Sequence, residues 1–297
     1  MKKFLLSSLF VAVLATASVA QRLPQPSPGA SVMQTIGVTD VTVKYSRPSL
    51  KGRAVFPTVL KYGEFWRTGA NQATNIEFST DVMVGGQKVP AGKYFLYSMP
   101  GENEWQVIIN KSAATSPEAY KQADDVVRVA VKPTALGSSV QTMTIGFSNL
   151  TDSSAHLEIS WDKFSVATPI VVDTKANAEA NVNKAVAEKP EDPAVLQTAA
   201  NFAMNQGKMD QALSLADKAI GVKETFRNVW LKAQILGKLG KFADALPLAQ
   251  KALSLGQASG DAGFPFMKTA IEGGISDFTS KIPALPVSIP GMKKKKG

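Results

Sequence analysis

The sequence contains no cysteine and a single histidine, His156, among its 297 residues. The absence of cysteine excludes a disulfide scaffold, a cysteine nucleophile and a cysteine-ligated zinc cluster. One histidine argues against a histidine-rich metal site and against a Ser-His-Asp triad. His156 lies on the polar side of an alternating segment, which favours a surface position over a catalytic one. We therefore expect no metal and no cofactor.

Several catalytic motifs are also missing. The chain has no GxxxxGK[ST], no GxGxxG after a strand, no HExxH and no GxSxG, which argues against nucleotide, zinc-protease and serine-hydrolase chemistry. These absences favour a protein that is not an enzyme. A hydrolase that uses Glu or Asp stays an alternative, because glycosidic cleavage needs only two carboxyl groups across a cleft. Candidate carboxyl groups are Glu64, Glu77, Glu102 and Glu104.

The net charge of +9 is concentrated at the two ends of the chain. Lys2 and Lys3 lie at the N-terminus, and Lys293–Lys296 form a run at the C-terminus. Residues 21–172 carry 14 basic and 12 acidic groups, and residues 173–292 carry 13 and 12. Because binding to nucleic acid requires a concentrated positive field, we expect no nucleic-acid partner.

Long hydrophobic runs are absent except at the start. Lys2 and Lys3 precede an apolar stretch, and Ser18-Val19-Ala20 supplies the small residues of a cleavage site. The stretch is shorter than the roughly 20 residues of a membrane span. Residues 1–20 therefore predict a signal peptide cleaved after Ala20, with export to the periplasm or the medium and no membrane span in the mature chain.

Residues 21–172 show apolar side chains with a period of two, which is typical of strands with one buried face. Gly85-Gly86 and Pro100–Asn103 separate neighbouring sets and favour hairpin turns. The pattern predicts an antiparallel β-sandwich or barrel-like domain. The alternating sets are Val41, Val43 and Tyr45; Ile76 and Phe78; Trp105, Val107 and Ile109; Val127, Val129 and Val131; Met143, Ile145 and Phe147; and Leu157, Ile159 and Trp161.

Residues 173–282 follow a helical pattern, so the fold class is mainly β plus α. A helix ends before Pro190, and Gly207-Lys208-Met209 with its following residues recurs as Gly240-Lys241-Phe242, at an offset of 33. Residues 193–255 resemble degenerate tetratricopeptide (TPR) repeats, whose period is about 34 residues. Pro247 lies inside the expected last helix of the second repeat and predicts a kink or a delayed start. A helical stripe through Ile271 and Phe278 predicts a capping helix, and the Pro- and Lys-rich residues 283–297 predict a disordered tail.

The β half carries an ordered series of motifs that resembles DUF2911, a bacterial domain of unknown function, over about residues 25–172. The resemblance implies an exported β-rich domain and no assigned activity or catalytic residue. The motifs are Tyr45-Ser46-Arg47-Pro48, Lys51-Gly52-Arg53, Trp66-Arg67-Thr68-Gly69-Ala70-Asn71, Ile76-Glu77-Phe78-Ser79, Pro90-Ala91-Gly92-Lys93-Tyr94, Pro100-Gly101-Glu102 and Trp105.

Residues 44–67 are rich in basic and aromatic side chains and contain one acid, Glu64. Guanidinium groups bind carboxylate, phosphate or sulfate in a bidentate manner, and aromatic rings offer flat apolar faces. We therefore interpret this loop as a binding site for a small anionic or carbohydrate ligand. The candidate site residues are Arg47, Arg53, Trp66, Arg67, Asn71 and Glu77.

The same residues also admit a purely structural interpretation. In that case Phe65 and Trp66 fill the core, Arg67 pairs with Glu77 or Glu64, and Asn71 caps a turn. A second functional alternative places the activity in the helical repeats, where residues 193–255 hold a protein partner on a concave surface.

Overall fold

The computed structural model describes residues 23–283. The described chain divides into two compact units, a β unit that ends at Asp173 and a helical unit that begins at Thr174. The expected signal peptide and nearly all of the expected tail lie outside the described residues.

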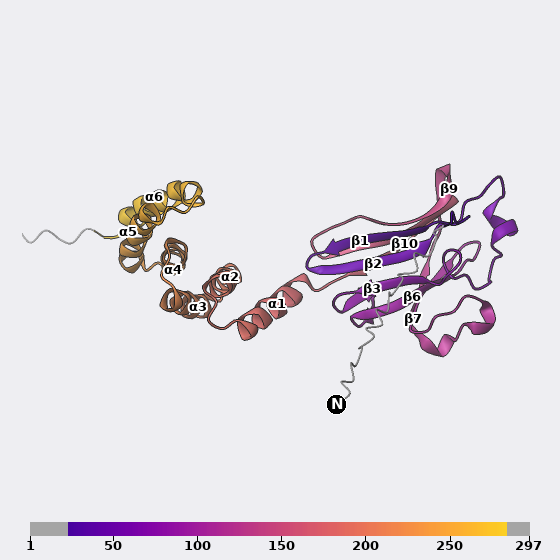
Figure 1. Cartoon of the computed structure of the whole chain (residues 1–297), viewed down its shortest axis with the longest axis horizontal. Helices are drawn as coiled ribbons and strands as arrows, with labels where there is room; N and C mark the ends of the chain where they lie inside the picture. The colour runs from indigo at the N-terminus through magenta and orange to yellow at the C-terminus, as the bar shows by residue number, and fades with distance from the viewer. Residues whose placement is uncertain (1–22, 284–297) are drawn as a thin grey trace, which may run out of the picture. The chain divides into compact units, whose positions relative to one another are not determined.

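The β unit consists of two antiparallel sheets (Figure 1). The first has the order β1-β2-β3-β6-β7-β8 and the second has the order β5-β4-β10-β9. The strands are β1 (Gly29–Ile36), β2 (Thr39–Ser46), β3 (Thr74–Phe78), β4 (Val82–Val84), β5 (Gln87–Val89), β6 (Gly92–Met99), β7 (Trp105–Asn110), β8 (Asp125–Val131), β9 (Thr134–Ser148) and β10 (Ser154–Val171).

The alternating residues form the core between the sheets. In β2 every second side chain from Thr39 to Tyr45 is buried, and β3 alternates in the same way. One hydrophobic cluster joins side chains of the first sheet, such as Ile76, to side chains of the second, such as Leu157. The predicted antiparallel sandwich is therefore confirmed. Burying these faces stabilises the unit by about 25 cal/mol per Å² of apolar surface.

A second, smaller cluster lies on the opposite face of the first sheet. It contains Tyr97 and Ile108, whose neighbours along each strand face the main core, together with Ala114. Phe65 and Tyr120 pack against it. The segment between β7 and β8, with its short helical turns η2 (Pro117–Ala119) and η3 (Gln122–Asp124), supplies Ala114 and Tyr120 and so covers this face.

Within the described residues the helical unit consists of six helices. The starts of α2 and α4 and the starts of α3 and α5 are each separated by the 33 residues of the sequence repeat. The helices are α1 (Thr174–Glu188), α2 (Pro193–Asn205), α3 (Met209–Val222), α4 (Phe226–Lys238), α5 (Phe242–Ser259) and α6 (Phe264–Lys281).

Glycines end the first helix of each repeat, as their positive φ angles show. Gly207 and Gly240 have φ values of 74° and 75°, in the left-handed region that side chains disfavour. Pro247 does not delay the second helix, because α5 begins at Phe242 and continues to Ser259. The predicted stripe in α6 is buried at Ile271 and Phe278.

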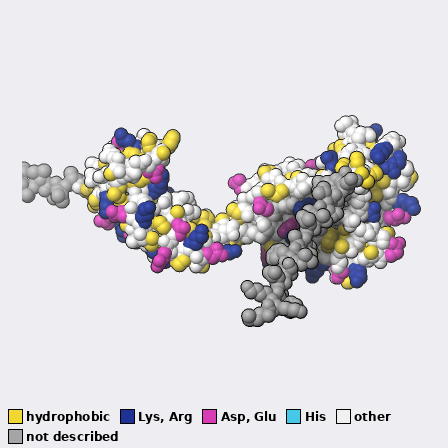
Figure 2. Space-filling view, viewed as in Figure 1, with side chains coloured by type: hydrophobic (Ala, Val, Ile, Leu, Met, Phe, Trp, Pro, Cys, Tyr) yellow, Lys and Arg dark blue, Asp and Glu magenta, His cyan; other side chains and the backbone are white. Residues whose placement is uncertain are grey.

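The surface carries charges of both signs. Lysine and arginine side chains are interspersed with aspartate and glutamate on both units (Figure 2). Within residues 23–283, no helix has the length and apolar content needed to cross a membrane.

Candidate functional site

The chain between β2 and β3, residues 47–73, crosses one end of the sandwich and contains a short helical turn, η1 (Val55–Val59). Trp66 is tied to β6 in strand-like fashion, because its main-chain N–H and C=O exchange hydrogen bonds of 2.8 and 2.9 Å with Ser98. Successive side chains of an extended chain point to opposite faces. Trp66 therefore enters the main core, whereas Phe65 packs against the outer cluster.

The turn after Trp66 is held in an uncommon backbone conformation. Thr68 has a φ of 53°, which is rare for a β-branched residue and costs of order 1–3 kcal/mol. Two buried hydrogen bonds fix it: the Thr68 hydroxyl contacts the Ser98 hydroxyl at 2.8 Å, and the Thr68 carbonyl accepts from Thr74 at 2.7 Å. The Trp66 indole donates to the Gly69 carbonyl at 3.0 Å. Arg67 is thus carried on a rigid turn.

A cavity of about 340 Å³ lies beside this turn. Its wall combines residues of the 47–73 segment with Trp161 of β10 and with Thr115 and Pro117 at the start of η2. Most of the lining side chains are apolar, and its charged members are Lys61, Glu64 and Arg67. The lining residues are Pro48, Pro57, Thr58, Val59, Leu60, Lys61, Glu64, Phe65, Trp66, Arg67, Gly69, Ala70, Thr115, Pro117 and Trp161.

The Arg67 guanidinium has few protein partners. One terminal nitrogen donates to the main-chain carbonyl of Thr115 at 2.5 Å. Nε is buried and has no acceptor among the described residues. Glu64, the one acid among the described residues that line the cavity, instead forms an exposed ion pair with Lys61 at 3.5 Å. A cation that is partly withdrawn from water without an anion beside it is poorly compensated.

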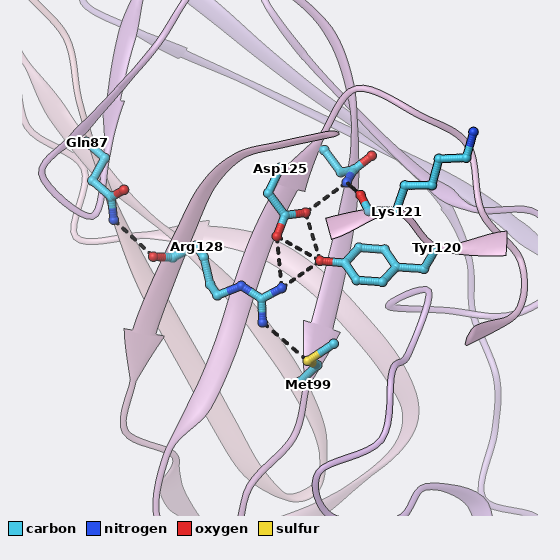
Figure 3. Close-up of polar contacts among 7 residues, drawn as sticks. Gln87, Met99, Tyr120, Lys121, Asp125 and Arg128 are labelled. Atoms are coloured by element: carbon cyan, nitrogen blue, oxygen red, sulfur yellow. Dashed lines mark hydrogen bonds and ion pairs between the residues drawn. The ribbon is translucent and has the colours of Figure 1, made fainter. Parts of the chain in front are cut away.

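A polar network anchors the segment that supplies Thr115. Figure 3 shows Tyr120, Asp125 and Arg128 pointing toward one another. The Tyr120 hydroxyl donates to Asp125 at 2.7 Å and accepts from Arg128 at 2.6 Å, and Arg128 pairs directly with Asp125 at 2.8 Å. Asn110 adds a hydrogen bond to Asp125.

Burial raises the pKa of the Tyr120 phenol above its ordinary value, and the acceptor Asp125 raises it further. Tyr120 is therefore a neutral hydrogen-bond donor at physiological pH, and its ring packs on Phe65, 4.9 Å between centroids. The network holds one wall of the cavity in place through Phe65.

The three predicted arginines do not converge. Arg47 donates across the sandwich to the Met143 carbonyl at 2.8 Å and to the Thr144 hydroxyl at 2.7 Å. Arg53 donates to carbonyl oxygens of its own turn, those of Ser49 and Leu50. Neither residue lines the cavity. The Arg47 guanidinium is held by acceptors on β9, and the Arg53 guanidinium by carbonyl oxygens of its own turn.

The remaining candidates, Asn71 and Glu77, also lie outside the cavity lining. Asn71 donates to the Ser27 carbonyl at 3.0 Å, and Glu77 pairs with Lys93 on the adjacent strand at 3.8 Å. The ion pair of Arg67 with Glu64 or Glu77, expected under the structural interpretation, does not form, since both acids pair with lysines. Of its other elements, Trp66 is buried in the main core, whereas Phe65 packs, partly buried, against the outer cluster. The Asn71 side chain bonds to the Ser27 carbonyl and not to its own turn.

Residues 27–170 match the model of a family described as protein of unknown function (DUF2911). The β unit resembles DUF2911. This match confirms the resemblance inferred from the motif series. No curated protein matches the chain.

Two wall residues of the DUF2911-like unit were not among the sequence candidates. Thr115 contributes a main-chain carbonyl, which no side-chain pattern reveals. Trp161 lies on the apolar register of β10 and is fully buried, so its sequence signal is that of a core residue. Its indole Nε1 is buried without an acceptor among the described residues, which the sequence does not indicate.

Proposed function

We propose that the β unit binds a small anionic ligand in the cavity beside Arg67. The observation that carries this proposal is the Arg67 guanidinium at the cavity. Within residues 23–283 it has no carboxylate partner, and its buried Nε has no acceptor. An entering anion would supply both the countercharge and acceptor oxygens. Charge-assisted hydrogen bonds of this kind are about twice as strong as neutral ones.

The composition of the wall favours binding over catalysis. Among the described residues that line the cavity, Glu64 is the one carboxylate, and Lys61 neutralises it. A glycosidase requires two carboxyl groups that face each other across the bond to be cleaved. A hydrolase is therefore the weaker candidate for this cavity, and a rigid loop on a sandwich is a common binding surface.

The proposal is tested by comparing the full chain with its Arg67→Gln variant in calorimetric titrations at constant ionic strength. Phosphate, acetate, benzoate and the neutral sugar glucose serve as probes. We expect at least one anion to bind the wild-type chain at least about tenfold more tightly than Arg67→Gln, because a charged hydrogen bond is lost. Arg53→Gln, which changes a guanidinium outside the cavity, is the matched control and keeps the wild-type affinity.

Two results would overturn the anion proposal. One is equal affinity of every anion for wild-type and Arg67→Gln chains of equal stability. The other is binding of glucose that does not depend on Arg67, which would favour a carbohydrate site. Loss of affinity in both Arg67→Gln and Arg53→Gln would indicate a general effect of surface charge instead.

A second candidate function concerns the helical unit, which we infer to be a degenerate TPR-like array that holds a protein partner. Its support is a cavity of about 560 Å³ lined from α2, α4 and α5, with a charged rim that includes Arg227 and Asp261. These two form an ion pair at 2.7 Å. A partner that co-purifies with the full chain should be lost in Arg227→Glu and kept in Lys268→Glu; a partner kept by both variants contradicts this candidate.

We further propose that the protein is exported and that its signal peptide is cleaved between Ala20 and Gln21. Support comes from the basic, apolar and small-residue pattern of residues 1–20. N-terminal sequencing of the chain recovered from its native cell envelope or medium should begin at Gln21, whereas an intact Met1 would contradict export by this signal.

A further inference from the structure

Two residues that line the same cavity each carry a buried N–H donor that has no acceptor among the described residues. These donors are Nε of Arg67 and Nε1 of Trp161. The other wall indole is different, because Nε1 of Trp66 donates to the Gly69 carbonyl. A buried donor without a partner destabilises the folded state, so two such donors on residues of one cavity wall indicate that acceptors are missing there.

The two tryptophans are packed against each other. Their rings are stacked with centroids 5.9 Å apart and an interplanar angle of 20°, and Trp66 also meets Trp105 edge to face. Trp161 is fully buried. Its indole therefore has little freedom to turn toward another acceptor. An acceptor for Nε1 has to be supplied by a molecule that enters the cavity.

The rest of the wall is suited to an apolar body. Besides the two tryptophans, six of the lining side chains are hydrophobic rings or branched chains: Pro48, Pro57, Val59, Leu60, Phe65 and Pro117. They accompany the Arg67 cation, which has no carboxylate partner among the described residues. A ligand with many hydroxyl groups would leave most of them without partners against this wall, and a polyanion would meet one unpaired positive charge. A volume of about 340 Å³ lies at the small end of ligand pockets.

We infer that the ligand of the proposed anion site is a small organic monoanion, a carboxylate attached to an apolar ring or branched chain. One carboxylate oxygen accepts from Arg67 and the other accepts from the indole N–H of Trp161, while the apolar body contacts the proline and aromatic wall. This inference rests on the proposed function, and it adds Trp161 as a residue that determines ligand class.

The experiment uses the full chain with benzoate as the probe, benzamide as its neutral analogue and inorganic phosphate as an anion without an apolar body. Calorimetric titration should give benzoate the highest affinity, with benzamide weaker by about tenfold or more, because it lacks the charge that Arg67 attracts. Phosphate should bind more weakly than benzoate, because it buries no apolar surface.

Trp161→Phe tests the second donor, because phenylalanine keeps an aromatic ring and removes the N–H. Benzoate affinity should fall about threefold to tenfold, the loss of one hydrogen bond. Trp230→Phe is the matched control in the helical unit and should leave the affinity unchanged. Unliganded unfolding midpoints establish that each variant is folded.

Indole N–H resonances give a second measurement that needs no variant. The chain has four tryptophans, and benzoate should shift one indole N–H resonance downfield as a new hydrogen bond forms. If no indole resonance moves, or if folded Trp161→Phe binds benzoate as tightly as the wild-type chain, the proposed hydrogen bond from Trp161 to the ligand does not form.

The outcomes separate this inference from the proposed function. If phosphate binding depends on Arg67 and benzoate binds no more tightly than phosphate, the proposed ligand class is wrong and the proposed anion site is still supported. Equal affinity for benzoate and benzamide would likewise overturn the carboxylate. If the affinity of every anion is the same with and without Arg67, both the ligand class and the proposed function are wrong.

Discussion

The indole Nε1 of Trp66 donates a hydrogen bond to the carbonyl oxygen of Gly69, 3.0 Å away, and Arg67 lies within the turn that this bond closes. The indole reaches the core, where it stacks on Trp161, while the carbonyl belongs to the strained turn. The packing of the core and the position of the candidate binding residue are therefore coupled through one side chain.

Replacing Gly69 by alanine should destabilise the β unit. Gly69 has a φ of 155°, and an added Cβ would lie 3.0 Å from both the Ser46 carbonyl oxygen and the Thr74 hydroxyl. We expect the free energy of unfolding, measured by urea denaturation, to fall by more than about 1 kcal/mol. Gly63→Ala is the control, because Gly63 has a φ of 77° and an added Cβ would meet no atom within 4 Å. Equal losses in the two variants would show that the close contacts at Gly69 do not matter.

Tyr120→Phe should destabilise the segment that carries Thr115. The substitution removes a hydroxyl that bridges Asp125 and Arg128, while the direct ion pair of 2.8 Å between them remains. Because the lost hydrogen bonds involve charged groups, we expect a loss of about 1.5 kcal/mol in thermal or urea unfolding. Tyr62→Phe is the matched control, since Tyr62 is 50% exposed and its hydroxyl has no hydrogen bond among the described residues. An equal effect of both variants would contradict the bridging role.

The sequence predicted the framework because strands and helices leave periodic patterns. Alternation from Val41 to Tyr45 places β2, and the repeat from Gly207 to Gly240 places the paired helices, since burial of one face imposes each period. The loop of residues 47–73 has no such period. Its composition singled out a segment that also lines the cavity, but it did not indicate which arginine is part of that lining.

Side-chain partners far apart in the chain explain the difference. Arg47 is satisfied by Met143 and Thr144, almost a hundred residues away, and Glu77 by Lys93 across a strand pair. Those partners exist only once the sheets have packed. Trp161 was assigned to the core by its register, correctly, but whether its indole N–H finds an acceptor depends on the packing of the loop against β10.

Glu158→Gln should lower the free energy of unfolding of the β unit at neutral pH. This loss of stability should become smaller as the pH falls. A hydrogen bond from Ser165, at 2.7 Å, with further bonds from serine side chains, lowers the pKa of the Glu158 carboxyl below its ordinary value. A carboxyl whose pKa is lower in the folded state contributes stability above its unfolded pKa, and this contribution is lost as the pH falls through the folded value. The expected difference at pH 7 is roughly 1 kcal/mol.

Urea unfolding of the wild-type and Glu158→Gln chains between neutral pH and about pH 3 checks the sign, since an ordinary glutamate titrates near pH 4.3. The gap in unfolding free energy should narrow as the pH falls. A gap that stays constant or widens in acid would show that the carboxylate form of Glu158 does not stabilise the fold.

Two adjacent glycines of α6 should respond in opposite directions to alanine. At Gly274 an added Cβ would lie 2.2 Å from the Trp230 ring, which is buried and packed against Phe278, whereas at Gly273 it would meet nothing within 4 Å. Glycine inside a helix costs roughly 0.5–1 kcal/mol relative to alanine. Gly273→Ala should therefore raise the stability of the helical unit by about that amount, while Gly274→Ala should lower it by about 1–3 kcal/mol through overpacking. Thermal unfolding followed by helical circular dichroism measures both, and stabilisation by Gly274→Ala would contradict the close packing of α6 on α4.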